Sequence, residues 1–353
     1  MTAPNSLLSE YFDLVKKAYL EAKQNLKNEI TYDYRICNFP IRLDFASTEI
    51  GPVITPAFNH LLEEDSTEPL LTIRVWDSAS TNVDFPIPPW ENLLTENNGD
   101  MWASETQRYK YYYRPGSGDL NFLDKEANEA IYWTRNIYQF PYYESGAPLR
   151  YLLNWWMNDF GIQLVHSGAV GNENGGVLLV GKGGSGKSTT ALACLNANFS
   201  YVSDDYCMVT SKPKPFAYSV YSAGKLNSQD INRFPKLLPA LSNIEKISEE
   251  KALYFLHQYF PHLISKGFPI HAILVPELTP GKETKIVKIS SAQSYLALAP
   301  STLFQLRGIK QSAQEVIGDL VRQIPSYKIK LGSDINKVAD VIAEFLSRKI
   351  YNE

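Results

Sequence analysis

The stretch VLLVGKGGSGKS at residues 177–188 decides the fold class of this chain. Residues 181–188 fit the pattern GxxxxGK[ST], in which glycines let backbone N–H groups turn inward around phosphate oxygens. The apolar run 177–180 is typical of a buried strand, and residues 189–195 continue as a helix whose N-terminus adds partial positive charge. A glycine-rich turn without a ligand is the alternative. We expect a phosphate-binding loop made of Gly181, Lys182, Gly183, Gly184, Ser185, Gly186, Lys187, Ser188 and Thr189.

Two side chains of this loop suit a nucleoside triphosphate. Lys187 would reach the β- and γ-phosphates, and the Ser188 hydroxyl would ligate Mg²⁺. The sequence therefore predicts ATP and Mg²⁺ as cofactors, although it does not distinguish adenine from guanine.

An acidic pair follows the loop. Asp204 and Asp205 come directly after the segment FSYVS at residues 199–203, which is typical of a strand. Adjacent carboxylates at the end of a strand point to opposite faces, so one can hold a metal while the other accepts a proton. For an isolated pair, a solvated turn is the alternative. The position after the loop and its helix favours the functional interpretation.

A histidine precedes the loop. Residues 165–170 and 177–180 read as two strands of a hairpin joined by GNENGG at residues 171–176. If Val170 pairs with Val177, the register places His166 opposite Gly181, at the mouth of the loop. We predict that His166 hydrogen-bonds Asp204, although a single histidine often has only a structural role.

A lysine completes the candidate site. Lys225 lies in SVYSAGKL at residues 219–226, a loop-like segment beyond the acidic pair. A cation near the phosphates would neutralise charge as a phosphoryl group moves, and a solvent-exposed lysine is the alternative. Arg150 and Arg307 are further candidates for this role.

Together, HSGA at residues 166–169, the hairpin, residues 181–188 and SDD at residues 203–205 resemble the core of HPr kinase/phosphorylase and its HPr kinase-like relatives. That bacterial family shares its phosphate-loop core with phosphoenolpyruvate carboxykinase. The similarity is close over residues 163–209. The family's Glu-(Ile/Leu)-Arg-Gly motif is missing after the acidic pair, and the nearest string is QLRG at residues 305–308, so phosphorolysis is not carried over.

The resemblance implies a role for each matching residue. Lys187 would bind phosphate, Ser188 would bind Mg²⁺, Asp204 would be the catalytic base helped by His166, and Asp205 would lie near the metal. The implied activity is an ATP-dependent kinase that transfers the γ-phosphate to a hydroxyl acceptor, a serine of a protein or peptide. A kinase of small hydroxylated molecules and a nucleotide-binding regulatory NTPase without phosphotransfer are the alternatives. The resemblance is also compatible with a homo-oligomer.

The length of 353 residues and the change of pattern along the chain predict two domains. Residues 1–146 read as a β-rich α+β domain for acceptor recognition, with a helix at 7–27 and strands at 41–45, 71–75 and 109–113. Residues 147–353 read as an HPr kinase-like α/β domain with a mixed sheet, beginning with the helix 149–160. We expect further helices at 245–265, after 291, at 311–323 and after 333, and strands near 270–275, 284–289 and 327–331. The fold class is α/β, or α+β overall.

Charge and composition exclude some classes of partner for this chain. The chain has 34 Lys and Arg against 38 Asp and Glu, for a net charge of −4. We therefore expect no nucleic-acid partner, because such proteins usually carry a basic excess. No run of 18 apolar residues occurs, so no membrane span is expected. The 3 cysteines show no CxxC spacing, which favours a reducing compartment, the cytoplasm.

Overall fold

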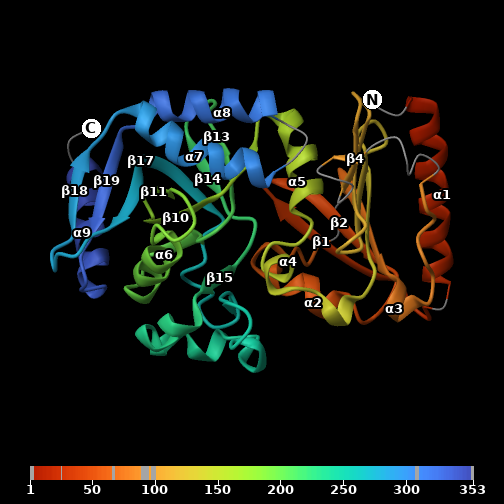
Figure 1. Ribbon diagram of the computed structural model, residues 1–353, viewed down its shortest axis with the longest axis horizontal. Coiled ribbons are helices and arrows are strands. Elements are labelled where there is room, and N and C mark those ends of the chain that lie inside the picture. The colour runs from red at the N-terminus through yellow and green to blue at the C-terminus, as the bar shows by residue number, and fades with distance from the viewer. Residues whose placement is uncertain are drawn as a thin grey trace. The chain divides into compact units, whose positions relative to one another are not determined.

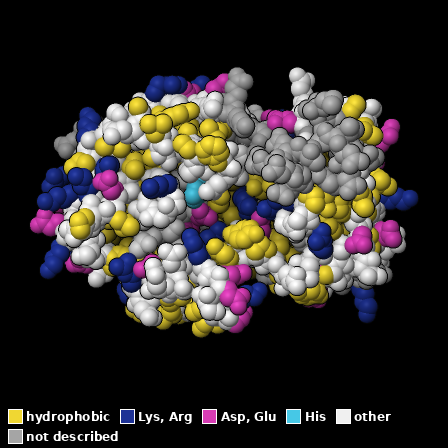
Figure 2. Space-filling model, in the orientation of Figure 1, with side chains coloured by type: hydrophobic (Ala, Val, Ile, Leu, Met, Phe, Trp, Pro, Cys, Tyr) yellow, Lys and Arg dark blue, Asp and Glu magenta, His cyan; other side chains and the backbone are white. Residues whose placement is uncertain are grey.

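The computed structural model describes residues 4–24, 26–65, 68–88, 95–96, 101–306 and 310–350. The chain divides into two units, Met1–Trp156 and Met157–Glu353, and both combine helices with a sheet (Figure 1). The mixed α/β class predicted from the sequence is confirmed. In Figure 2, basic and acidic side chains are interspersed over the visible face. None of the helices built from the described residues combines the length and the apolar character needed to cross a membrane.

The first unit is built on a sheet of eight described strands in the order β1-β2-β3-β8-β7-β6-β5-β4. The strands are β1 (Ile30–Ile36), β2 (Phe39–Phe45), β3 (Leu71–Asp77), β4 (Thr95–Glu96), β5 (Met101–Glu105), β6 (Tyr109–Arg114), β7 (Asp119–Asp124) and β8 (Glu129–Thr134). The helices are α1 (Asn5–Lys23), α2 (Gly51–Ile54), α3 (Ser78–Thr81), α4 (Tyr142–Ser145) and α5 (Arg150–Met157). The predicted opening helix and the strands at 41–45, 71–75 and 109–113 are confirmed as α1, β2, β3 and β6.

Helix α1 packs on one face of this sheet through an apolar stripe. Leu8 and Val15 are buried with Tyr11 and Phe12, because residues three or four apart on a helix share a face. The Phe12 ring meets Phe122 of β7 at 4.9 Å between centroids, and Tyr11 meets Tyr111 of β6 at 5.9 Å. The aromatic strand at 109–113 therefore belongs to a core.

The boundary between the units falls after Trp156 rather than at residue 146. The cause is helix α5, which the sequence assigned to the second domain. The Trp156 indole N–H donates to Asn128 Oδ1 at 2.8 Å, and the Trp156 ring packs against Phe39 at 5.4 Å. Tyr151 of the same helix packs against Tyr112 at 4.9 Å. Helix α5 thus buries its aromatic side chains in the first unit.

The second unit is built on a sheet of nine described strands. Their path is β12-β10-β11-β17-β14-β13-β9, with β19 beside β17 and β18 beside β19. The strands are β9 (Gln163–Val165), β10 (Ser167–Asn172), β11 (Gly175–Val180), β12 (Ser200–Ser203), β13 (Cys207–Thr210), β14 (Phe216–Tyr218), β17 (Gly267–Leu278), β18 (Lys285–Lys288) and β19 (Ser326–Leu331). A separate pair joins β15 (Ala223–Leu226) and β16 (Ala252–Phe255). Val170 pairs with Val177, which confirms the predicted hairpin register.

Helices cover both faces of this sheet. They are α6 (Lys187–Asn196), α7 (Ser291–Gln305), α8 (Lys310–Gln323) and α9 (Asn336–Ile350). Val177 and Leu179 of β11 pack in the core with α6 and α9, whereas Leu178 and Val180 pack in the core with α7 and α8. This alternation follows from the period of two along a strand. Figure 1 shows α7 and α8 on one side of the sheet and α6 on the other.

One predicted helix of this unit is wrong. Residues 245–265 contain a 3₁₀ turn at Ile244–Lys246 and the strand β16. Strand β16 pairs with β15, so that Leu253 lies opposite Lys225. Pairing with a distant strand overrides the local helical pattern here. The other predicted helices and strands of the second unit are confirmed as α7, α8, α9, β17, β18 and β19.

Candidate nucleotide-binding site

The phosphate loop joins the end of β11 to the start of α6. Gly184 and Gly186 have φ values of 77° and 103°, in the left-handed region that favours glycine. Gly186 is also the N-cap of α6, and a Cβ there would lie 2.6 Å from Leu331 Cδ1. The glycines therefore let the loop turn tightly into a helix N-terminus, which is the geometry that binds phosphate.

Lys187 begins α6, and its side chain folds back over the loop. Its Nζ donates to the carbonyl oxygens of Gly181 at 2.7 Å and Lys182 at 3.3 Å. Burial lowers the pKa of Lys187, while the charges of Asp205 and Asp204 act in the opposite direction. The ammonium thus lies at the mouth of the loop, close to the acidic pair.

The remaining loop residues lie where the sequence predicts. Lys182, Gly183 and Gly184 form the exposed part of the loop, and Ser188 and Thr189 lie in the first turn of α6. Ser185 Oγ is buried and has no hydrogen-bond partner within the described part of the chain. A phosphate oxygen or a water molecule could accept its proton.

Asp204 is buried, with 2% of its surface exposed. Its Oδ2 accepts a hydrogen bond from the Lys225 backbone N–H at 3.1 Å, and its Oδ1 lies 3.2 Å from the Tyr201 hydroxyl. The Ser188 side chain, in the first turn of α6, favours the ionised form of the same carboxylate. Burial and the neighbouring charge of Asp205 raise the pKa of Asp204 to about 6. Asp204 is therefore an interior carboxylate held by the Lys225 backbone and Tyr201.

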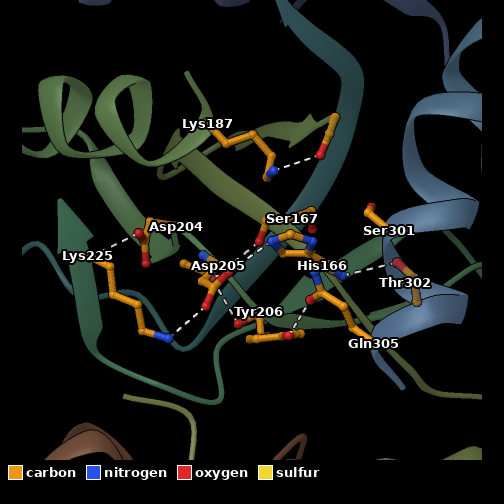
Figure 3. Close-up of polar contacts among 12 residues, drawn as sticks. His166, Ser167, Lys187, Asp204, Asp205, Tyr206, Lys225, Ser301, Thr302 and Gln305 are labelled. Atoms are coloured by element: carbon orange, nitrogen blue, oxygen red, sulfur yellow. Dashed lines mark hydrogen bonds and ion pairs between the residues drawn. The ribbon is translucent and has the colours of Figure 1, made fainter. Parts of the chain in front are cut away.

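Asp205 has different surroundings (Figure 3). Its Oδ1 lies 3.0 Å from His166 Nε2, and its Oδ2 lies 2.8 Å from Lys225 Nζ. Its side chain is 25% exposed. Burial would raise the pKa of this carboxyl, but the Lys225 ammonium and the hydrogen bond from His166 outweigh it and hold the pKa well below its usual range. Asp205 is therefore held ionised at the edge of the site.

The predicted hydrogen bond between His166 and Asp204 is wrong, because His166 bonds Asp205 instead. Asp204 turns inward to the Lys225 backbone and Ser188, and the next carboxylate meets the histidine. The histidine lies one residue before Ser167, which pairs with Val180 at the end of β11. The hairpin register thus predicts the position of His166 at the mouth of the loop. The register does not predict which carboxylate His166 bonds.

Helix α7 and Tyr206 hold the histidine. The His166 backbone N–H donates to Thr302 Oγ1 at 3.1 Å. The His166 ring lies against Tyr206 at 5.4 Å between centroids, and the Tyr206 hydroxyl donates to Gln305. Sequence reasoning missed these three residues. Tyr206 directly follows the acidic pair, which is a usable signal, but nothing in the pattern of α7 points to the site.

Lys225 lies on strand β15 rather than in a loop, and it is 7% exposed. This burial excludes the alternative interpretation, in which Lys225 is a solvent-exposed lysine. Its backbone N–H and its Nζ contact different carboxylates of the acidic pair. Arg150 lies in the first unit, where it bonds Glu144 at 2.7 Å. Arg307 lies outside the described residues.

A magnesium ion would depend on few protein ligands. Across the residues that the structure describes, no group of three or more His, Cys, Asp or Glu side chains could hold a metal ion. Hydroxyl and carboxylate oxygens suit Mg²⁺, which usually takes one or two protein carboxylates together with phosphate oxygens and water. The Ser188 hydroxyl and the nearby Asp204 carboxylate offer such oxygens at the start of α6.

Comparison with known proteins adds little to this geometry. No protein-family model matches the chain, and no curated protein matches it. Among solved structures, the chain is similar to the Hpr(Ser) kinase/phosphatase from Coxiella burnetii, with 11% identity and a TM-score of 0.31, over 54% of this chain and 99% of that one. The interpretation of the site therefore rests on the contacts described above.

Proposed function

We propose that this chain is an ATP-dependent kinase that transfers the γ-phosphoryl group of ATP to a hydroxyl acceptor. A serine of a protein or peptide is the acceptor we infer first, and a small hydroxylated molecule is the alternative. The observation that carries the proposal is the meeting of the phosphate loop with two carboxylates and the buried Lys225. A phosphate loop alone serves many kinds of NTPase, whereas a kinase also needs a proton acceptor for the incoming hydroxyl.

The residues present fit ATP with Mg²⁺. Loop N–H groups and the N-terminus of α6 would bind the phosphates, and Lys187 would exchange its bonds to loop carbonyls for phosphate oxygens. Ser188 and a carboxylate of the acidic pair would hold the metal. Mg²⁺ would supply positive charge that compensates the charge of the phosphate oxygens.

The remaining step is the transfer of the phosphoryl group itself. The acceptor oxygen attacks the γ-phosphorus, and the bond from that phosphorus to the β–γ bridging oxygen breaks, so that the electron pair leaves with ADP. The hydroxyl proton passes to one carboxylate of the acidic pair. Lys187 would compensate the charge of the transferring group, and Lys225 would hold the Asp205 carboxylate in place.

Incubation with γ-labelled ATP tests this proposal. The acceptors are a library of serine-containing peptides and a set of hydroxylated metabolites. The variants are Lys187→Met and, as a matched control, Lys212→Met, whose side chain is 82% exposed. We expect acceptor-dependent transfer of label that falls at least about a hundredfold in Lys187→Met and persists in the control.

Two results would contradict the proposal. Phosphate release at one rate with and without every acceptor would point instead to a regulatory NTPase without phosphotransfer. Failure of wild-type protein to bind ATP with Mg²⁺ would remove the nucleotide site itself.

A further inference from the structure

We propose that the acidic pair divides its work in a fixed order, in which Asp205 receives the acceptor's proton and Asp204 holds the metal together with Ser188. This inference rests on the proposed phosphoryl transfer at the loop. It reverses the assignment that the sequence resemblance implies. His166 and Lys225 then act through Asp205 as positioning residues.

The first argument is access. A general base must come within hydrogen-bond distance of the proton that it removes. Asp204 is 2% exposed, and its oxygens face Tyr201, Ser188 and the backbone of Lys225. The Asp205 side chain is 25% exposed. An acceptor hydroxyl can therefore reach Asp205, whereas Asp204 lies behind the groups that bond it.

The second argument is the place of the metal. In phosphate-loop proteins, Mg²⁺ is held by the loop Ser or Thr and by an acidic residue of a neighbouring strand. Asp204 follows strand β12 directly, and it is the carboxylate whose ionised form the Ser188 side chain favours. Ser188 would ligate the metal through an oxygen lone pair, and Asp204 would ligate it through a carboxylate oxygen. Among the described residues, the Asp205 carboxylate pairs instead with His166 and Lys225.

The third argument is the clamp around Asp205. One carboxylate oxygen faces His166 Nε2 and the other faces Lys225 Nζ, so both oxygens have a donor within 3.0 Å. A metal ion at Asp205 would have to displace or repel the Lys225 ammonium. A hydroxyl proton, in contrast, needs only a remaining lone pair, and each carboxylate oxygen has two. Figure 3 shows His166 and Lys225 approaching Asp205 from separate elements.

Lys225 contacts both carboxylates of the acidic pair, each through a different group. Its backbone N–H bonds Asp204 at 3.1 Å, whereas its ammonium bonds Asp205 at 2.8 Å. Lys225→Met removes the ammonium and keeps the backbone bond. In the step itself, the acceptor oxygen–phosphorus bond forms, the bridging phosphorus–oxygen bond breaks toward ADP, and the hydroxyl proton moves to Asp205 and then to solvent.

Manganese binding in the presence of ADP provides the first test, read by the EPR signal of free Mn²⁺. The compared proteins are wild type, Asp204→Asn, Asp205→Asn, Lys225→Met and the control Asp319→Asn, whose carboxylate lies on α8 and pairs with Arg322. We expect Asp204→Asn to weaken Mn²⁺ binding by at least about tenfold. Lys225→Met and Asp205→Asn should stay within about threefold of wild type. Loss of Mn²⁺ binding in Asp205→Asn with binding intact in Asp204→Asn overturns the assignment.

Transfer of label from γ-labelled ATP to the acceptor identified for the wild type is the second test. Asp205→Asn should lower kcat by about 10² to 10⁴-fold with the KM for ATP unchanged, as expected for loss of a general base. Lys225→Met should lower kcat in the same way, and Lys225→Arg should restore part of it. An unchanged kcat in Asp205→Asn contradicts the inference.

These outcomes are separable from failure of the proposed function. Wild type that binds no nucleotide or transfers no label defeats the kinase proposal before the variants are compared. Wild type that transfers label while the two aspartate variants show the reversed pattern defeats only the division of roles. If one aspartate variant does not fold by circular dichroism, Lys225→Met still decides between the assignments, because its ammonium contacts Asp205 alone of the pair.

Discussion

Each unit of this protein contains a buried ionic cluster, and the two clusters differ in what surrounds them. In the first unit, Glu144 bonds Arg150 at 2.7 Å and Arg114 at 2.9 Å, while Arg114 lies 2.7 Å from Asp119. In the second unit, the acidic pair bonds His166 and Lys225 beside the phosphate loop.

In each cluster, one carboxyl group has a raised pKa and another has a lowered pKa. Burial raises the pKa of Asp119, whereas Glu144 has a lowered pKa because Arg150 and Arg114 outweigh the effect of its burial. Asp204 and Asp205 show the same split. Separated pKa values often mark an acid and a base in a catalytic site. Here they occur in both clusters, so the split itself does not distinguish a site from a structural ion pair.

What distinguishes them is adjacent structure. The cluster of the first unit consists of carboxylates and guanidinium groups that pair with one another. The cluster of the second unit lies beside a glycine loop, a helix N-terminus and Lys187, which together can receive a phosphate. The carboxylate Asp205 also remains partly exposed. The comparison predicts that changes in the first cluster alter stability and changes in the second alter chemistry.

The largest expected effect is on the stability of the first unit. Arg150→Met leaves one oxygen of the buried Glu144 without its partner, so we expect the free energy of unfolding of this unit to fall by about 3–5 kcal/mol. Urea denaturation followed by tryptophan fluorescence measures this change. The double variant with Glu144→Gln should lose less than the sum of the single variants. A loss of nucleotide binding in folded Arg150→Met would break the comparison.

Lys187→Met should have the next largest effect, and this effect should be on phosphoryl transfer rather than on stability. Loss of the ammonium at the loop should weaken phosphoryl transfer by at least about a hundredfold, or about 2.7 kcal/mol. The unfolding of the first unit should not change. Label transfer from γ-labelled ATP and a thermal melt check these two statements, and isothermal titration with ATP and Mg²⁺ measures the accompanying loss of binding. Equal losses of stability and of binding would show that the lysine is structural.

A smaller effect concerns two buried tyrosines of the second unit. The Tyr201 hydroxyl bonds the Ala223 carbonyl at 2.7 Å and lies near Asp204, so Tyr201→Phe should lower the free energy of unfolding by about 1–2 kcal/mol. The Tyr254 hydroxyl is buried without a hydrogen-bond partner among the described residues, and Tyr254→Phe is the matched control. It should be neutral or stabilising. Equal costs in urea denaturation would contradict this account.

The smallest effect belongs to an exposed ion pair. Glu344 and Arg348 lie four residues apart on α9, and both side chains are largely exposed. Glu344→Gln should change the free energy of unfolding by less than about 0.5 kcal/mol, since water and salt screen such pairs. A cost comparable with that of Arg150→Met would show that burial does not separate the clusters from surface pairs.

Sequence patterns predicted the local parts of the second unit well. The phosphate loop, the hairpin register and the elements from β17 to α9 follow from glycine positions and from periods of two and 3.6 residues. Contacts between distant segments escaped this reasoning. Lys225 was expected in a loop because the pairing of β15 with β16 joins residues far apart in the chain. The partner of His166 and the contribution of Thr302 depend in the same way on how strands and α7 pack.

The amino-acid sequence by itself determined that a strand, a glycine loop and a helix start stand in order, and that two adjacent carboxylates follow the next strand. These features are local, because backbone freedom at glycine and the periodicity of apolar residues act over a few residues. Only the tertiary structure decided which carboxylate meets the histidine, that a lysine of β15 touches both, and that α5 packs with the first unit. These contacts join segments that are far apart in the sequence, so they depend on burial and on side-chain geometry in the folded chain. Adjacent side chains on a strand point to opposite faces, so a shift of one residue would exchange the partners of the two carboxylates.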